Sequence, residues 1–293
     1  MKCIIVTGGL GFIGSHFIDI CIKNKIFVIN IDNLSVGANK KNINVNKKYY
    51  KFHKIDIKNK IKIKNIIKKY KPYAIINFAA ETHVDRSISD PLSFIETNVI
   101  GLSNLANQFR IFINTNSQKK YKFIQISTDE VYGSTNKSSF KETDSLKPNS
   151  PYSSSKAAAE LILRSLHKTY DFKSIIIRPS NNFGPRQYEE KLIPLALMKL
   201  RNNQSIPIYG KGKNKREWFY VEDCAKTIYN ILNSKIKHGT YNIGSNNLFS
   251  NLFLIKNLIN EFKKINKNKN AKSKFYKFVK DRPGHDFRYS LNS

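Results

Sequence analysis

Short runs of β-branched and other apolar residues alternate with longer stretches of helical periodicity over the first 180 residues. The runs predict buried strands, at 2–7, 26–31, 50–55, 73–77, 121–127 and 173–178. The longer stretches predict helices, at 12–24, 58–70, 91–112 and 150–170. Strands that alternate with helices in this way predict an α/β fold with a doubly wound parallel sheet.

The pattern changes after Arg178, where prolines and glycines punctuate a more irregular region. Helices are predicted there at 221–233 and 251–264, and the stretch 263–274, rich in Lys and Asn, predicts a surface loop. We therefore expect a larger domain at 1–178 and a smaller C-terminal domain at 179–293. Some segments of the second part, about 216–245, are expected to return to the first domain.

Composition narrows the class of protein. The 293 residues are 40% hydrophobic, which is enough for a sizeable core, and no apolar run is long enough to cross a membrane. Residues 1–6 lead straight into a glycine-rich turn and leave no room for a signal peptide, so a cytoplasmic location is expected. Cys3, Cys21 and Cys224 are scattered, without a CxxC pair, and are expected to be small core residues. No His, Asp or Glu cluster has metal-ligand spacing, so no metal is expected.

The net charge of +30 raises the question of a polyanion partner. The chain has 42 lysines and only 9 arginines, and the lysines are spread throughout. Proteins that read nucleic acids depend on arginine for forked contacts to bases. We interpret the charge as a solvated basic surface rather than a nucleic-acid footprint. Such a surface would still attract an anionic nucleotide substrate.

A glycine-rich turn joins the first predicted strand to the first predicted helix. Its glycines fit GxGxxG as Gly9, Gly11 and Gly14, and GxxGxxG as Gly8, Gly11 and Gly14. Glycine permits a tight turn and close approach of the backbone to a pyrophosphate, which the helix N-terminus then binds through its N–H groups. Because the turn follows a strand and opens a helix, it predicts a dinucleotide-binding Rossmann domain. A purely structural glycine turn is the alternative.

Two acids stand near the ends of the next two strands. Asp32 lies 18 residues after Gly14, where a carboxylate accepts hydrogen bonds from the adenosine ribose and repels a 2′-phosphate, which favours NAD over NADP. The alternative for Asp32 is a turn formed with Asn33. Asp56 is placed to contact the adenine amino group or to cap the helix that begins near Lys58, and both roles are compatible.

Tyr152 and Lys156 form a YxxxK pattern within the helix predicted at 150–170. Their spacing places both side chains on one helix face, where the ammonium, with the nicotinamide cation nearby, lowers the pKa of the phenol. A phenolate can take the proton of an alcohol while a hydride leaves its carbon. Together with the glycine-rich turn, the pattern is similar to that of the short-chain dehydrogenases/reductases, and the chain length suggests their extended, sugar-nucleotide branch.

Two adjacent acids, Asp129 and Glu130, follow the fifth predicted strand within the segment 127–133. Ligands meet this fold at the carboxyl ends of parallel strands. One acid can serve as general acid and the other as general base if their environments separate their pKa values. The alternative is a surface turn with two solvated acids.

At this point the chain closely resembles the dTDP-glucose 4,6-dehydratases over its full length. The segments that carry the resemblance are 78–87, 127–133, 180–185, 190–194, 207–210, 216–218 and 281–286. The adjacent acids separate this family from relatives such as the 4-epimerases. Two departures are Glu189, where the family often has proline, and Glu217, where aspartate is usual. Family members usually continue beyond Ser293, so we expect either a truncated chain or a thinner substrate domain.

The resemblance implies a reaction in three steps. Tyr152 would deprotonate the glucose 4-hydroxyl, which Thr128 holds, while the C4 hydride passes to NAD+, and Lys156 would bind the nicotinamide ribose. Glu130 would remove the C5 proton, and Asp129 would protonate the departing 6-hydroxyl, so that water is lost. The hydride then returns to C6. The product would be the 4-keto-6-deoxy sugar nucleotide, and the cofactor would stay bound.

The resemblance also implies two sets of binding residues. The cofactor site would comprise Gly8, Gly11, Phe12, Ile13, Gly14, Asp32, Asn33, Leu34, Asp56, Ile57, Ala79, Ala80, Thr97, Tyr152, Lys156 and Asn182. The sugar nucleotide would be held by Thr82, Thr128, Asn181, Lys191, Leu192, Pro207, Tyr209, Arg216, Asn251, Arg282 and His285. The cations among them suit a diphosphate. Surface charge and core packing are the alternatives for several of them.

The resemblance further implies a homodimer formed through the helices at 91–112 and 150–170. Alternatives for the function stay open at this stage. A UDP-glucose 4,6-dehydratase would share the same motifs, and the adjacent acids disfavour a sugar-nucleotide epimerase or decarboxylase. A protein that only binds NAD or nucleic acid would not need the full catalytic set.

Overall fold

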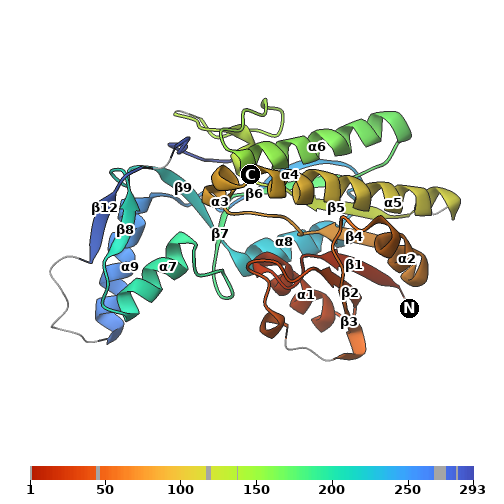
Figure 1. Cartoon of the computed structure of the whole chain (residues 1–293), viewed down its shortest axis with the longest axis horizontal. Coiled ribbons are helices and arrows are strands. Elements are labelled where there is room, and N and C mark those ends of the chain that lie inside the picture. Colours follow the sequence, from red (N-terminus) through yellow and green to blue (C-terminus); the bar gives the residue numbers. More distant parts are fainter. Residues whose placement is uncertain (1, 44–46, 117–119, 137, 267–274, 282) are drawn as a thin grey trace.

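A computed structural model of the chain describes residues 2–43, 47–116, 120–136, 138–266, 275–281 and 283–293. Its main feature is one sheet of seven parallel strands (Figure 1). Across the sheet the order is β10 (Gly239–Ile243), β6 (Ile175–Pro179), β5 (Lys122–Ile126), β4 (Ala74–Asn77), β1 (Cys3–Thr7), β2 (Phe27–Asp32) and β3 (Tyr50–Lys54). The predicted parallel sheet is confirmed. The strand β10 was not predicted, because its sequence Gly-Thr-Tyr-Asn-Ile mixes polar and apolar residues.

Helices cover both faces of this sheet. One face carries α1 (Phe12–Lys23) and α8 (Val221–Asn233), which pack against each other. The other face carries α2 (Lys60–Tyr70), α5 (Leu102–Thr115) and α6 (Pro151–Tyr170). The three cysteines are buried and free, as expected of small core residues. Each face of a parallel sheet must be covered in this way, because both faces are apolar.

The helix predicted at 91–112 is present but interrupted. It consists of α4 (Pro91–Ile95), a π-helical turn η3 (Glu96–Gly101) and α5, and it is preceded by α3 (Val84–Ser89). The wider π turn places Asn98 inside, where its amide donates to Ser155 Oγ over 2.8 Å. Such turns are frequent at functional sites, and no periodicity in the sequence marks this one.

A smaller region extends from the carboxyl edge of the sheet, on the left in Figure 1. It contains the sheet of β7 (Asn181–Phe183), β9 (Lys215–Tyr220) and β11 (Leu248–Ser250), and the pair β8 (Ile206–Tyr209) and β12 (Tyr276–Val279). Its helices are α7 (Leu192–Arg201) and α9 (Asn251–Asn266), which share a separate core with β8. The described residues also form three short 3-10 turns, which are η1 (Lys40–Asn42), η2 (Lys47–Tyr49) and η4 (Asp129–Tyr132).

The surface loop predicted at 263–274 begins inside α9, and its residues 267–274 lie outside the described residues. Within the part of the chain that the structure describes, no helix has the length and apolar character needed to cross a membrane. The strand order reverses between β1 and β4, because β2 and β3 lie on one side and β5 and β6 on the other. Ligands bind at such a switch point in open α/β sheets, so this is where a site is sought.

Candidate active site

A cavity of about 290 Å³ opens at this switch point, along the carboxyl ends of the main strands. Most of the residues expected to bind the cofactor or to take part in catalysis line this cavity. The expected residues that line it are Gly8, Gly11, Phe12, Ile13, Gly14, Asp32, Asn33, Ile57, Ala79, Ala80, Thr82, Thr97, Thr128, Asp129, Glu130, Tyr152, Lys156, Asn181, Asn182 and Lys191. Segments far apart in the sequence therefore meet in one place.

The glycine-rich turn is packed so closely that larger side chains would not fit. Gly8 has a φ of +67°, and a Cβ there would lie 2.5 Å from the backbone nitrogen of Ala79. A Cβ on Gly14 would lie 2.7 Å from the carbonyl oxygen of Gly8. The helix α1 that follows has Gly11 at its N-cap, with no side-chain cap and no acid in its first turn. Its first N–H groups thus remain available to a phosphate.

Asp32 has the turn-forming role that was the alternative for it. Its Oδ2 accepts from the backbone N–H of Leu10 over 3.0 Å, and its Oδ1 accepts from that of Leu34 over 2.8 Å. It therefore shapes the turn after β2, and it also lines the cavity. Burial raises its pKa, and the two hydrogen bonds oppose that rise.

Asp56 does not cap α2, so that expectation is wrong. The helix begins later because Asn59 is its N-cap and accepts from the backbone N–H of Lys62 over 3.0 Å. Asp56 instead accepts from the backbone N–H of Lys58 over 2.8 Å. Neither Asp56 nor Leu34 is among the residues that line the cavity.

The opposite wall of the cavity follows β6 and carries polar atoms without partners. Ser180 Oγ, Asn181 Nδ2 and Asn182 Oδ1 are buried and have no hydrogen-bond partner among the described residues. Buried polar groups are normally paired, so these atoms suit a polar ligand. Together with the uncapped helix and Asp32, they fit a dinucleotide with an unphosphorylated adenosine ribose.

Tyr152 and Lys156 project from the first turns of α6. That helix starts at a capping box of Ser150 and Ser153, with proline at the first helical position. Lys156 Nζ donates to the carbonyl oxygen of Ile126 over 2.6 Å. Burial lowers the pKa of Lys156 to about 8, and the charge of Glu160 opposes this.

The surroundings of Tyr152 oppose the ionisation of its phenol. Burial raises its pKa most, the charges of Glu130 and Asp129 also raise it, and a hydrogen bond with Thr128 opposes the rise. The expected lowering of this pKa therefore depends on the nicotinamide cation as well as on the Lys156 ammonium.

Asp129 and Glu130 begin the turn η4 and have different environments. Asp129 is buried, and its pKa lies well above the usual value because of burial and the charge of Glu130. Its Oδ2 has no hydrogen-bond partner among the described residues. Glu130 is less buried, and its Oε2 accepts from Tyr289 Oη over 3.5 Å. The two acids therefore have distinct surroundings, and burial favours the protonated form of Asp129.

Of the substrate residues expected beyond Arg178, Asn181 and Lys191 line the cavity, and most of the others lie outside its lining. Among them, Arg216 donates to the carbonyl oxygen of Asp286 over 2.9 Å and lies 4.3 Å from the centre of the Tyr289 ring. Tyr209 Oη donates to Asp85 Oδ2 over 3.3 Å, and His285 pairs with Asp281 over 2.6 Å.

The other expected substrate residues are placed as follows. Lys191 lines the cavity and donates to the carbonyl oxygen of Thr82 over 3.0 Å. Leu192 begins α7, Pro207 lies in β8 and Asn251 begins α9, all outside the lining. Arg282 lies outside the described residues. The structure thus brings only part of this set together.

Tyr289 is a site residue that sequence reasoning missed. It is 2% exposed and contacts both Glu130 and the carboxylate of Asp286. It lies 159 positions after Glu130, and no spacing links the two. Further lining residues that were not expected are Ile31, Ser35, Val36, Gly37, Ala38, Ile55, Phe78, Ile126, Ser127, Pro179, Ser180, Gln187 and Tyr188. The motif quoted at 127–133 already contained Ser127.

Two residues of the quoted motifs have structural roles. His83 is the N-cap of α3 and accepts from the backbone N–H of Arg86 over 3.4 Å. Trp218 is 8% exposed and packs edge-on against Phe183. In the described part of the chain, no group of three or more His, Cys, Asp or Glu residues is placed to hold a metal ion.

Comparisons with known proteins agree with this geometry. Residues 5–293 match the family described as GDP-mannose 4,6 dehydratase. The dTDP-glucose 4,6-dehydratase of Haemophilus influenzae is 41% identical over the whole chain, which covers 90% of that protein, and the one from Neisseria gonorrhoeae is 37% identical, with 88% covered. The crystal structure of a Streptomyces venezuelae dTDP-glucose 4,6-dehydratase with NAD bound is also similar, with a TM-score of 0.90 at 35% identity, covering all of this chain and 88% of that one.

Proposed function

The chain belongs to the GDP-mannose 4,6-dehydratase family, and from this premise we propose that it is an NAD-dependent hydro-lyase that converts dTDP-glucose to dTDP-4-keto-6-deoxyglucose. One observation carries this proposal within the family. Two adjacent acids, of which Asp129 has a raised pKa, line a single cavity together with the YxxxK pair: Asp129, Glu130, Tyr152 and Lys156. An enzyme that only oxidises and reduces C4 has no need of the two acids, whereas elimination of water needs both an acid and a base.

In the first step the sugar is oxidised at C4. The Tyr152 phenolate takes the proton of the 4-hydroxyl, and Thr128, on the adjoining turn, holds the same oxygen. The glycine-rich turn and Asp32 would hold NAD, which would supply the hydride acceptor for C4, the hydride donor for C6 and a positive charge near Tyr152. Lys156 stays protonated and holds a ribose hydroxyl, and its own position is set by the Ile126 carbonyl.

In the second step the two acids remove water. The 4-ketone acidifies the C5 proton, and the Glu130 carboxylate takes it. Asp129 gives its proton to the leaving 6-hydroxyl oxygen, which departs as water. The raised pKa of Asp129 supports this role, since the acid must carry its proton at neutral pH. The proton on Glu130 exchanges with solvent, and Glu130 then protonates C5 when the hydride arrives at C6.

The test is mass spectrometry of products formed in deuterated water. The purified chain is incubated separately with dTDP-glucose and UDP-glucose. We expect dTDP-glucose to lose one water and to gain one solvent deuteron at C5. No mass change with dTDP-glucose, but water loss from UDP-glucose, would replace the substrate. No change in either sugar nucleotide would overturn the dehydratase assignment.

We also propose the expected homodimer. Several large apolar side chains are exposed on the helices α3 to α6, namely Ile88, Leu92, Ile95, Ile100, Ile111 and Leu161. Exposed apolar groups on neighbouring helices support an interface there. Light scattering on a gel-filtered sample tests this: twice the mass of the 33.8 kDa chain supports the dimer, and a monomer rejects it.

Two further expectations remain proposals. The chain is divided into a Rossmann domain at 1–178 and a substrate domain at 179–293, with α8 and β10 returning to the first. The separate apolar core of α7, α9 and β8 supports this division. A cytoplasmic location is supported by three free thiols, since disulfides are rare in that compartment.

A further inference from the structure

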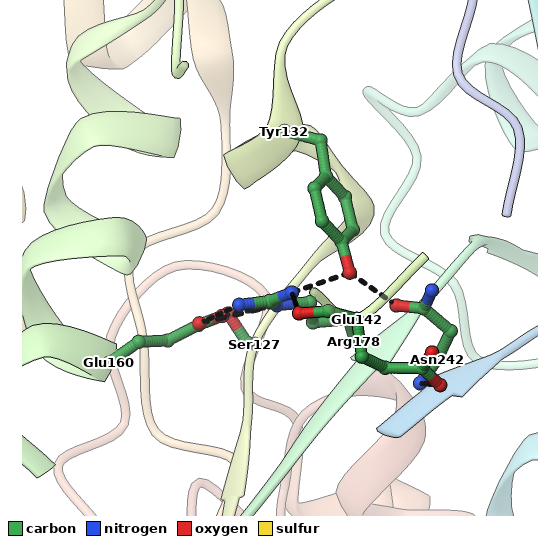
Figure 2. Close-up of polar contacts among 6 residues, drawn as sticks. All are labelled: Ser127, Tyr132, Glu142, Glu160, Arg178 and Asn242. Carbon is green, nitrogen blue, oxygen red and sulfur yellow. Dashed lines mark hydrogen bonds and ion pairs between the residues drawn. The ribbon is translucent and has the colours of Figure 1, made fainter. Parts of the chain in front are cut away.

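A buried ion pair lies directly behind the proposed catalytic residues. Glu160 of α6 and Arg178 of β6 are both 0% exposed. Arg178 Nε donates to Glu160 Oε1 over 3.0 Å, and Arg178 Nη2 donates to Glu160 Oε2 over 2.5 Å. Burying two charges costs much of what their attraction returns, so such a pair is weak evidence for stability alone. Its contacts, drawn in Figure 2, indicate a second role.

On one side, Glu160 holds the residue that precedes the catalytic turn. Its Oε1 accepts from Ser127 Oγ over 2.5 Å, and Thr128 follows directly in the chain. Glu160 also lies four positions after Lys156, so the two share a face of α6. Since Lys156 holds the Ile126 carbonyl, α6 fixes the end of β5 at two successive residues.

On the other side, Arg178 holds the residue that ends the catalytic turn. Arg178 Nη1 donates to Tyr132 Oη over 2.5 Å, and the guanidinium lies 4.5 Å from the centre of that ring. Tyr132 Oη in turn donates to Asn242 Oδ1 of β10 over 2.8 Å. Figure 2 shows the guanidinium between Glu160 and Tyr132. The Glu160–Arg178 ion pair therefore holds both ends of the turn that carries Asp129 and Glu130, through Ser127 at one end and Tyr132 at the other.

We propose that Glu160 and Arg178 are positioning residues for the proton transfers: they fix the turn of Asp129 and Glu130 from both ends, and Glu160 sets a negative charge one helical turn from the Lys156 ammonium. This proposal rests on the function proposed above, because it assigns Asp129, Glu130 and Lys156 to that chemistry. Neither residue lines the cavity, so neither contacts the substrate.

The charges around Lys156 give the expected direction of a pH effect. Tyr152 and Glu160 lie on the same face of α6 as Lys156, Arg178 of β6 pairs with Glu160, and Asp129 of η4 lines the same cavity as Lys156. Burial already lowers the pKa of Lys156 to about 8, and Glu160 acts against that. Loss of the Glu160 charge should lower this pKa further. The protonated fraction of Lys156, and the rate with it, would then begin to fall at a lower pH.

The test uses the double variant Glu160→Gln/Arg178→Met, which removes both charges and leaves no buried charge without a partner. We expect it to fold, with kcat about tenfold lower or more and KM little changed, because the turn is misplaced rather than the substrate site. We expect the alkaline limb of its pH profile to move to lower pH by about one unit. The control is Glu261→Gln, which breaks the exposed pair with Lys264 and should change neither.

A second readout does not depend on turnover. The pH dependence of Lys156 acetylation, followed by peptide mass spectrometry, reports the ionisation of this amine directly. Its midpoint should move to lower pH in the double variant and stay in the control. Identical midpoints in the double variant and the wild type would overturn the charge role, even if the wild type made no product and the proposed function failed.

Tyr132→Phe separates the two parts of the proposal. It removes the hydroxyl that accepts from Arg178 but retains every charge. We expect kcat to fall with no movement of the alkaline limb. If this variant and the double variant both keep the wild-type kcat while the wild type is active, the positioning role is rejected and the proposed function stands.

Discussion

The two sides of the cavity are built in different ways. On the side of the main sheet, the ends of β5 and β6 are joined to α6 by short hydrogen bonds and a buried ion pair. On the side of the smaller region, Arg216 donates to the backbone carbonyls of Asp286 and Phe287 in the C-terminal segment. The proposed catalytic groups are thus held by the sheet and α6. We propose that substrate recognition depends on the smaller region, which has its own core.

The largest effect is expected at Tyr152, on the side of the main sheet. Tyr152→Phe removes the phenol whose ionised form takes the proton of the 4-hydroxyl, and the rate should fall about 10²- to 10⁴-fold. Absorbance of the reduced nicotinamide should not rise when substrate is added. Tyr170→Phe, at the exposed end of the same helix, is the control. Normal formation of reduced cofactor in Tyr152→Phe would remove this residue from the first step.

Glu130→Gln should stop the reaction one step later. C4 oxidation can still occur, because Tyr152 is intact, but the C5 proton has no base to take it. Product should form at least about 100-fold more slowly while reduced cofactor accumulates. Rapid-mixing absorbance and product mass measure the two steps, with Glu222→Gln as an unrelated acid. Wild-type turnover would contradict the role of Glu130 as base.

A substitution in the core of the smaller region should weaken substrate binding without affecting NAD binding on the side of the main sheet. Ile255→Ala truncates a side chain that is 0% exposed, and should lower the free energy of unfolding by about 2–5 kcal/mol. KM for the sugar nucleotide should rise while bound NAD is retained. Ile265→Ala, on the same helix but 78% exposed, should change neither. Release of NAD by Ile255→Ala would show that the two sides are not independent.

The smallest effect is expected at Lys191, which lines the cavity at the boundary of the two regions. Lys191→Ala should raise KM about tenfold with kcat little changed, because it removes one charge-assisted contact. Steady-state kinetics at fixed ionic strength measures this. Lys199→Ala removes a lysine of α7 that is bonded to Gln204 and provides the control. Equal effects of the two variants would mean that only the overall positive surface acts on the substrate.

The sequence by itself determined the parts of the protein that depend on local pattern. Short runs of apolar residues predicted six strands of the main sheet, because a strand buried on both faces must be apolar wherever it lies. Spacing predicted that Tyr152 and Lys156 share a helix face, and motif position predicted that Asp129 follows a strand. All three line the cavity. The family itself could be identified from these segments.

Only the tertiary structure determined the burial and the electrostatic environment of these side chains. The raised pKa values of Asp129 and Tyr152 come from burial and from neighbouring charges, which no spacing encodes. The contact of Tyr289 with Glu130 and the pairing of Glu160 with Arg178 join segments that are distant in the sequence. Local patterns arise from the backbone geometry of single elements. Burial and electrostatics arise only when those elements pack together.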